Sequence, residues 1–275
     1  MDIDRILNFS SNAGKAMLQS GGETYRVEET IARICQSFGI DHVDVFATPT
    51  AVMASVFVDG KLHSAIKRIS SRRVDLNLVH EVNSLSRAIS INNLDIELCE
   101  KILDEISEDN YYSDLITIFF AGIAAATFSI LFGGNVEEFI AAFTVGILTK
   151  FVIMYLSKSS LNDFFVNAIG AVIIASCSIL ILKLGFIKTL DHLIAGAIML
   201  LVPGLALTNA LRDLLDGQLI SGLAKLAEVF FVGVSIAVGM FLVLGLYFKL
   251  GGDISAFVYR SNSSFFYCLK LWSAI

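Results

Sequence analysis

Long apolar runs, almost without formal charge, fill the second half of the chain. Five such runs, each about the length of a helix that crosses a bilayer, cover residues 115–134, 139–157, 164–182, 192–211 and 229–248. Small residues recur within them, as at Gly122, Gly146 and Gly239, and such residues let helices pack closely in lipid. The pattern predicts a mainly α membrane protein, with a bundle of five transmembrane helices over residues 115–254 and a tail over 255–275.

The first 114 residues show the shorter, amphipathic patterns of a small α+β domain. Apolar residues recur at helical spacing in four segments and alternate as in strands in three: helices over 3–19, 24–38, 76–89 and 94–106, and strands over 42–48, 51–58 and 62–69. Gly21-Gly22 can end the first helix, and Ser20 or Thr24 can cap the second. Asp59-Gly60 predicts a hairpin between the last two strands. The last helix is strongly acidic, and we expect it to run into the first membrane span.

Charge is distributed unevenly and separates these two parts. Residues 1–114 hold 11 Lys or Arg and 18 Asp or Glu, whereas the longer remainder holds 9 and 8. Only 17% of all residues are charged, below the roughly 25% usual in soluble domains, and the mean hydropathy is +0.72. The N-terminus lacks the apolar core of a signal peptide. We therefore expect a cytoplasmic domain over 1–114 and a multi-pass membrane protein.

Several function classes find no support in the sequence. A net charge of −6 gives no reason to expect a nucleic-acid partner. The four cysteines are far apart and form no CxxC or metal-ligand pair. Walker, GxGxxG and HExxH spacings are missing, as is a convincing Ser/His/Asp arrangement. We expect no enzyme activity, no cofactor and no metal site, and the lipid bilayer is the first partner.

Pro203-Gly204 interrupts the fourth apolar run, where a helix would lose a hydrogen bond and its regularity. Asn209, Asp213 and Asp216 follow at helical spacing on one face, with Arg212 four residues before Asp216. Broken membrane helices with polar groups near the break form substrate sites in many transporters. The alternative is an interfacial helix end held by an Arg212–Asp216 pair.

A lysine within the second apolar run is a further candidate. An intramembrane cation is costly and therefore a functional candidate, although Lys150 could also snorkel towards the headgroups. The predicted lining of a solute path comprises Lys150, Pro203, Gly204, Asn209, Arg212, Asp213 and Asp216.

Polar motifs in the N-terminal domain leave alternatives open. Glycines and polar side chains from Ser20 to Thr30 begin a predicted helix, where unpaired N–H groups can bind a small anion, and Arg26 could add a bidentate contact to a carboxylate. The alternative is a capped helix–turn–helix. Thr48-Pro49-Thr50 could bind a ligand or be only a tight strand connection. Asn83 and Arg87 share a helix face of a kind that is usually only solvated.

Four segments occur together in an order that carries a family resemblance. They are SGGETYRVEETIARI, VDVFATPTAVMASV, IKRISSRRVDLNLVHEVNSLSRAI and GAIMLLVPGLALTNALRDLLDG, spread over about residues 10–250. They resemble the threonine/serine exporter (ThrE-like) family, although Gly22 stands where alanine would be expected. The matching positions are Gly21, Glu23, Thr24, Arg26, Glu28, Thr48, Pro49, Thr50, Arg68, Asn83, Arg87, Pro203, Gly204, Asn209, Arg212, Asp213 and Gly217.

The resemblance implies export of a small hydrophilic metabolite across the bacterial inner membrane, with threonine, serine or a dicarboxylate such as succinate as the solute. For a short member like this chain it also implies a separate small membrane partner subunit of four or five spans. Because no ATP site is visible, coupling to the proton gradient is the simplest supposition, with Asp213 as the proton-linked carboxylate. The alternatives are a membrane-anchored enzyme or sensor whose soluble domain binds the metabolite, and a regulatory subunit of a pore formed by its partner.

Overall fold

The computed structural model describes residues 2–70, 72–108, 112–159 and 161–252. Two compact units divide the chain: the first holds residues 1–111 and 203–230, and the second holds residues 112–202 and 231–275. The predicted division into 1–114 and 115–254 differs from this one, because residues 203–230 belong to the first unit. The expected tail, 255–275, lies outside the described residues.

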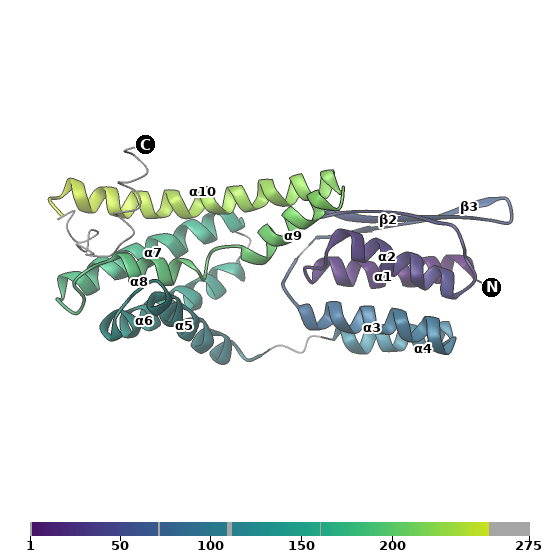
Figure 1. Cartoon of the computed structure of the whole chain (residues 1–275), viewed down its shortest axis with the longest axis horizontal. Coiled ribbons are helices and arrows are strands. Elements are labelled where there is room, and N and C mark those ends of the chain that lie inside the picture. Colours follow the sequence, from purple (N-terminus) through teal and green to yellow (C-terminus); the bar gives the residue numbers. More distant parts are fainter. Residues whose placement is uncertain (1, 71, 109–111, 160, 253–275) are drawn as a thin grey trace, which may run out of the picture. The chain divides into compact units, whose positions relative to one another are not determined.

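The first unit has three layers, namely a sheet, a first helix pair and a second helix pair (Figure 1). The sheet packs on α1 and α2, which in turn pack on α3 and α4. Every element lies within a few residues of its predicted position: α1 (Ile3–Gln19), α2 (Thr24–Ser37), β1 (Val43–Thr48), β2 (Ala51–Val58), β3 (Lys61–Arg68), α3 (Leu76–Asn92) and α4 (Ile96–Ser107). This part of the chain thus combines helices with a small three-stranded sheet.

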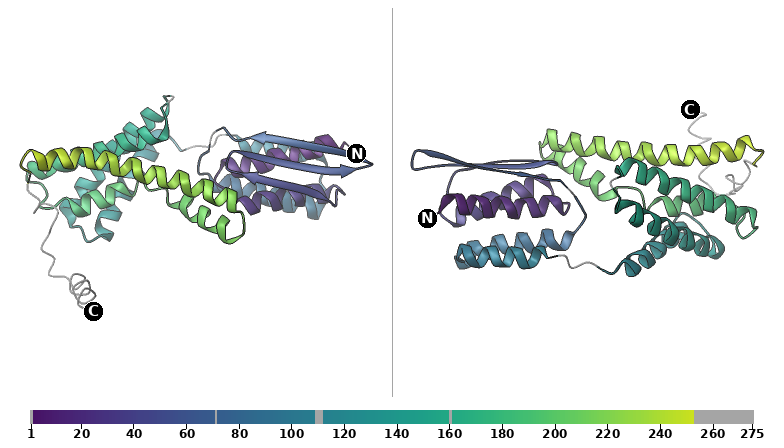
Figure 2. Two further views of the ribbon diagram at one scale, coloured as in Figure 1. Left: turned by 90° about the horizontal axis from the view of Figure 1, so that it is seen from above. Right: turned by 180° about the vertical axis from the view of Figure 1, so that it is seen from behind.

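The sheet is antiparallel, in the order β1-β2-β3, with its strands side by side over the helices (Figure 2). Asp59 and Gly60 form the predicted two-residue turn, and both have positive φ, 53° and 75°, as such hairpins require. Strand alternation buries one face on the helices. The opposite face leaves several large apolar side chains exposed: Phe46, Met53, Phe57, Leu62 and Ile66.

The core of the first unit follows from the predicted periodicity. Leu7 and Met17 of α1, Ile31 of α2, and Val52 and Val56 of β2 are at most 2% exposed. Because side chains of this kind each contribute about 1.5–3 kcal/mol when fully buried, this layer holds the sheet and the first helix pair together.

The second unit is a helical bundle. Its helices are α5 (Asp114–Leu131), α6 (Val136–Ser157), α7 (Asp163–Lys183), α8 (Asp191–Ile198) and the later part of α10 (Leu219–Lys249). α5, α6, α7 and α10 are the four helices of the described residues that are long and apolar enough to cross a membrane. Two helix backbones come close together at Gly146, one of the small residues in the second apolar run. A Cβ on Gly146 would lie 2.7 Å from the Cβ of Ala125 in α5.

The fourth predicted span is not one helix. α8 ends at Ile198 after 8 residues, and α9 (Gly204–Leu215) begins directly after Pro203. The break at proline agrees with the sequence prediction, but a span over 192–211 does not, because α8 is only about 12 Å long against a hydrocarbon core of about 30 Å. α9 lies in the first unit. Five spanning helices are therefore not found among the described residues.

The predicted continuation of the acidic helix into the first span is also wrong. α4 ends at Ser107, and its C-cap Glu108 has extended backbone, φ −61° and ψ 138°. α5 begins separately at Asp114. Consecutive acidic residues near the end of α4 repel one another and face the negative end of the helix dipole, which favours a stop there.

Candidate functional site

The turn between α1 and α2 shapes one half of the candidate site. Gly21 has φ +87°, a conformation that glycine adopts without strain. The N–H of Gly22 donates to the carbonyl of Met17 at 2.9 Å and the N–H of Gly21 to that of Leu18 at 3.3 Å, which is the Schellman pattern that ends a helix. A Cβ on Gly22 would lie only 2.9 Å from the Met17 carbonyl oxygen, so glycine fits this position better than the expected alanine.

The turn between α9 and α10 shapes the other half by the same physics. Gly217 has φ +83°, and the N–H of Gln218 donates to the carbonyl of Asp213 at 2.8 Å. This second Schellman turn reverses the chain after Asp216, the C-cap of α9. It leaves Asp213 in the last turn of α9 and Lys225 in the second turn of α10 in contact with each other.

Asp213 and Lys225 meet Thr24, the first residue of α2, in a buried cluster that we call the junction. The Thr24 N–H and hydroxyl donate to the two oxygens of the Asp213 carboxylate, at 3.3 and 2.8 Å. The Lys225 ammonium donates to the same carboxylate at 2.7 Å and to the Thr24 hydroxyl at 3.2 Å. Asp213 and Thr24 are fully buried and Lys225 is 7% exposed. Asp213 thus caps α2 from a distance of 189 residues along the chain.

Two further polar contacts flank the junction. The Asn209 amide donates to the Gly21 carbonyl at 2.9 Å. Arg212 forms an ion pair with the carboxylate of Glu23, whose side chain is 11% exposed. The alternative Arg212–Asp216 pairing is therefore not the one found: Asp216 is exposed at the C-cap, and the guanidinium turns to Glu23 instead.

A second set of contacts fixes the start of α10 on the sheet. Glu28 accepts the Ala47 N–H at 2.9 Å and the Gln218 amide at 2.7 Å. The Ser221 hydroxyl donates to the Ala47 carbonyl at 2.9 Å. Burial raises the pKa of the Glu28 carboxyl, an effect that its two hydrogen bonds partly offset. The hairpin of α9 and α10 is thereby anchored on both α2 and β1.

Beside the junction lies a cavity of about 180 Å³. Its wall includes Gly21, Pro49, Asn209 and Lys225, with Arg72 at its edge in an ion pair with Glu228 at 2.8 Å. The cavity thus combines apolar walls with a lysine and an arginine. Such a lining can receive a small molecule that carries a carboxylate.

The predicted anion site at the start of α2 has an occupant within the chain. The N–H group and the hydroxyl that would bind a free anion are turned to the Asp213 carboxylate. The start of α2 thus holds a negative group of the chain itself, as the N–H groups of a helix N-terminus favour. However, neither Ser20 nor Thr24 caps α2 through its own side chain: Ser20 is the C-cap of α1, and the N-cap is Glu23.

The remaining predicted residues lie away from the junction. Arg26 pairs with Glu23, at 3.4 Å. The Thr48 hydroxyl closes the β1–β2 turn through the backbone of Ala51, at 3.2 Å, which favours the tight connection over a ligand site. Asn83 contacts Arg33 of α2 at 3.4 Å. The other four sit elsewhere: Thr50, Arg68 and Arg87 are exposed, and Lys150 is half-buried in α6 of the second unit.

The sequence pattern did not single out Lys225, Gln218 or Ser221. Lys225 stands within a stretch that precedes the fifth apolar run and looks like an ordinary helix end. Its separation of 12 residues from Asp213 crosses a turn, so no helical periodicity links the two. The signal that could have found it is the turn glycine, Gly217, which predicts an antiparallel return.

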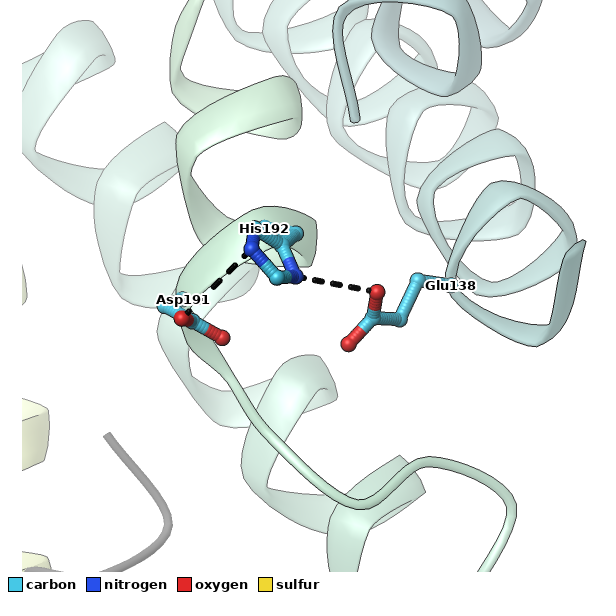
Figure 3. A group of neighbouring side chains, drawn as sticks. All are labelled: Glu138, Asp191 and His192. Carbon is cyan, nitrogen blue, oxygen red and sulfur yellow. Dashed lines mark hydrogen bonds and ion pairs between the residues drawn. The ribbon is translucent and has the colours of Figure 1, made fainter. Parts of the chain in front are cut away.

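A second polar cluster, which the sequence also did not single out, lies in the second unit. The buried Glu138 accepts hydrogen bonds from the Thr189 hydroxyl at 2.7 Å and from the Asn135 N–H at 3.0 Å, and its carboxylate lies 3.1 Å from His192 Nδ1. Asp191 lies on the other side of the ring, 3.7 Å from Nε2 (Figure 3). We call Glu138, Thr189, Asp191 and His192 the Glu138 cluster. Glu138, Asp191 and His192 could also hold a metal ion.

Most of the chain, including these motifs, is similar to one known protein family. The family model described as "Putative threonine/serine exporter" (ThrE) matches residues 8–247. A relative from Klebsiella aerogenes, "Probable succinate transporter subunit YjjP", is 25% identical over 232 residues, which cover 84% of this chain and 90% of the relative. The protein of the same name from Escherichia coli (strain K12) is 25% identical over 238 residues, or 85% and 91%.

A third relative is longer. The "Threonine/serine exporter" of Corynebacterium glutamicum is 27% identical over 250 residues, which cover 86% of this chain and 50% of that protein. No solved structure gives a significant match to the chain. These three relatives are named as transporters or exporters and not as enzymes. Because the family match spans most of its length, the chain belongs to the ThrE family of membrane exporters.

Proposed function

We propose that the chain is a subunit of an inner-membrane exporter for a small hydrophilic metabolite that carries a carboxylate. Threonine, serine and succinate are the solutes in the names of its relatives. The observation that carries the proposal is the junction. Two motifs that match the family, at residues 20–28 and 203–217, meet there as one buried polar cluster.

Through the junction, binding of a solute could move a helix that is long and apolar enough to cross a membrane. α10 begins beside the junction and continues for 31 residues as a candidate membrane span. A solute carboxylate in the neighbouring cavity would compete for Lys225 and Arg72, which both line it. Since Lys225 also holds Asp213 and Thr24, binding there would shift the α9–α10 hairpin against α2. A cavity of about 180 Å³ is smaller than the roughly 300–1,000 Å³ of drug-sized pockets, which suits a small metabolite.

Energy and topology complete the proposal. The sequence has no Walker motif, so we infer that export uses the proton gradient. We further propose that the unit with residues 1–111 lies on the cytoplasmic side of the membrane. The relatives named as transporter subunits support a separate membrane partner, which we propose to be a small protein of four or five spans.

A second role merits a test because the cavity is lined by residues of the first unit. In that case the chain would be a regulatory subunit that binds the metabolite, and its partner would form the pore. Reconstitution into liposomes with and without the partner separates the two roles. Specific solute binding by this chain, combined with full transport by the partner alone, would favour regulation.

The main test is efflux from cells preloaded with threonine, serine or succinate. Cells that express the chain with its partner should release one of the three faster than cells without the chain. Asp213→Asn should reduce that release, because it removes the counter-charge of Lys225 at the junction. Asp216→Asn is the matched control, since Asp216 is exposed one turn further along. Equal efflux of all three solutes with and without the chain would overturn the proposal.

A further inference from the structure

We propose that Glu138, Asp191 and His192 bind one divalent ion of a first-row transition metal, such as Zn²⁺ or Mn²⁺, and that this ion fastens the start of α8 to the start of α6. The inference is independent of the proposed export function, because it concerns the binding of an ion and not the transport of a solute. None of the four family-like segments of the sequence contains these three residues.

The three side chains are ligands of the kind that such an ion prefers. Imidazole and carboxylate groups together suit first-row divalent ions. One donor atom of each residue lies within 4.8 Å of the donor atoms of the other two. Nδ1 of His192 lies 3.1 Å from Oε2 of Glu138, and Nε2 lies 3.7 Å from Oδ2 of Asp191 (Figure 3). Ligand atoms bound at about 2.0–2.2 Å from Zn²⁺ are roughly 3–3.5 Å apart, so small side-chain rotations place one nitrogen and two oxygens around a single ion.

The charges of the cluster also favour a cation at this place. The Glu138 side chain is 4% exposed, and a buried carboxylate is costly unless it is paired or coordinates a metal. Among the described residues, Glu138 and Asp191 form ion pairs with the histidine and with no lysine or arginine. Two carboxylates, a neutral imidazole and a divalent ion carry no net charge together, which suits the apolar interior of a helical bundle.

Two buried oxygens at the cluster have no hydrogen-bond partner among the described residues. They are Oγ of Ser129, a fully buried residue of α5, and Oδ1 of Asp191. A Cβ on Gly134 would lie 2.8 Å from the Ser129 oxygen and 3.1 Å from Oε2 of Glu138, so these two oxygens face the same space. Buried oxygens of this kind are expected to contact an ion or an ordered water. Oδ1 of Asp191 is therefore a direct ligand in the proposal, and Ser129 accepts a hydrogen bond from a water on the ion.

The turn between α5 and α6 leaves room beside the ligands. Gly133 has φ +102°, where other residues are strained, and a Cβ on it would lie 3.5 Å from Nε2 of His192. A Cβ on Gly134 would lie 2.7 Å from the carbonyl oxygen of Ser129. Both positions therefore favour glycine, and the backbone of the turn approaches the cluster without a side chain between them. The side chains of His192 and Asp191 are 24% and 34% exposed, which gives an ion a path from water.

Hydrogen bonds hold the Glu138 carboxylate in place, as metal ligands in proteins generally require. The Thr189 hydroxyl donates to Oε1 at 2.7 Å, and the Asn135 N–H donates to Oε2 at 3.0 Å. Each carboxylate oxygen has a second lone pair that an ion can use. Asn135 is the N-cap of α6, and Thr189 lies two residues before α8. These contacts orient Glu138 from the same two helix starts that the ion would join.

A bound ion would matter most for α8. This helix has only 8 residues, and helices of that length depend on tertiary contacts. Asp191 and His192 are its first two residues, so an ion that also binds Glu138 holds this end of α8 to α6. We therefore expect the ion to stabilise the second unit.

The first test is the metal content of the full-length protein, purified in detergent through a tag without histidines. After treatment with EDTA, incubation with Zn²⁺ and removal of free metal, elemental analysis should find about one Zn²⁺ per chain. His192→Gln and Glu138→Gln should each lower the affinity for Zn²⁺ at least about 10–100-fold, because even the loss of a contact that orients a ligand costs this much. Glu137→Gln, at the exposed neighbour of Glu138, and His80→Gln, at an exposed histidine of α3, are the matched controls and should bind like the wild type.

The second test keeps the proposal falsifiable if a variant folds poorly. Thermal unfolding of the wild type in detergent should shift to higher temperature when Zn²⁺ replaces EDTA, because an ion that binds only the folded state stabilises it. Thr189→Val retains all three ligands, and it should weaken Zn²⁺ binding about 10–100-fold while a saturating concentration still gives one ion per chain. Excess Mg²⁺ should not displace Zn²⁺, since the imidazole ligand favours the transition metal.

Two results would overturn the proposal. The first is wild-type protein that binds neither Zn²⁺ nor Mn²⁺ in a fixed ratio and unfolds at the same temperature with Zn²⁺ and with EDTA, in which case the cluster is a hydrogen-bonded network alone. The second is a bound ion whose affinity is the same in the wild type, Glu138→Gln and His192→Gln, because the ion then lies elsewhere. No step measures transport, so a failure of the exporter proposal leaves both outcomes readable.

Discussion

Replacing Asp213 by asparagine should loosen the start of α2 more than any other single conservative change at the junction. The carboxylate is fully buried and accepts bonds from the Thr24 N–H, the Thr24 hydroxyl and the Lys225 ammonium. Asparagine keeps the shape but leaves Lys225 as a buried charge without its counter-ion. Removal of one partner of such a pair costs about 3–5 kcal/mol, and the weakened helix cap adds about 1 kcal/mol.

The reactivity of Cys35 measures this effect. Cys35 lies in the last turn of α2, is fully buried, and reacts only when the first unit opens. A pulse of a thiol reagent on the full protein in micelles, with peptide mass spectrometry to separate Cys35 from the other cysteines, gives the opening free energy. Since about 1.4 kcal/mol corresponds to a tenfold change, a loss of about 3–5 kcal/mol predicts labelling that is roughly a hundred to a few thousand times faster.

A double-mutant cycle tests the cause. Lys225→Met should be destabilising by itself, because it strands the buried carboxylate, but Asp213→Asn combined with Lys225→Met should label more slowly than Asp213→Asn alone. Asp216→Asn, at the exposed end of the same helix, should label at the wild-type rate. If Asp213→Asn also labels Cys35 at the wild-type rate, the junction is not a stabilising contact and this reasoning is refuted.

Three further changes follow from single features. Burial raises the pKa of Glu28 above its ordinary value of 4.5. The stability that this shift contributes is therefore full below about pH 4.5 and is lost as the pH rises through the raised pKa. Glu28→Gln should remove this pH dependence from thermal unfolding midpoints, and an unchanged pH profile would contradict the assignment. Gly21→Ala should destabilise by roughly 1–2 kcal/mol, because φ is +87° there and L-residues are strained in that region; Cys35 labelling reads the change. Gly239→Leu should lower the stability of the protein by about 1–3 kcal/mol or more, because a Cβ there would lie 2.3 Å from the carbonyl oxygen of Ala168 in α7. Gly233→Leu is the matched control: a Cβ at Gly233 meets no atom within 4 Å, so this variant should unfold at the wild-type temperature in detergent.

Local sequence signals predicted most elements of the first unit because each had its own chemistry. The Asp59-Gly60 pair specified a two-residue hairpin, and alternation in β1 and β2 specified the buried face. Gly21-Gly22 ended α1 where a left-handed residue was needed. The same kind of signal, Pro203, located the break between α8 and α9, since proline prevents continuation of a helix.

The fate of the broken segment could not be read from hydropathy. Residues 192–211 form an apolar run of membrane length, but only α8 belongs to the second unit, and α9 belongs to the first. Composition measures how apolar a segment is and does not tell whether lipid or protein covers it. Leucine and alanine side chains are favourable both against lipid and in the interior of a protein.

The sequence by itself determined most elements of the first unit, the break at Pro203, the family and the residues of both motifs, because periodicity, turn residues and residue types act over a few neighbouring positions. Only the tertiary structure decided which groups meet. It assigned Asp213 to the start of α2, paired Arg212 with Glu23 rather than Asp216, and brought His192 between Glu138 and Asp191. The contacts of Asp213 with Thr24, of Arg212 with Glu23 and of His192 with Glu138 join residues that are 54 to 189 positions apart. Such partners are chosen by how helices pack, which no local pattern encodes.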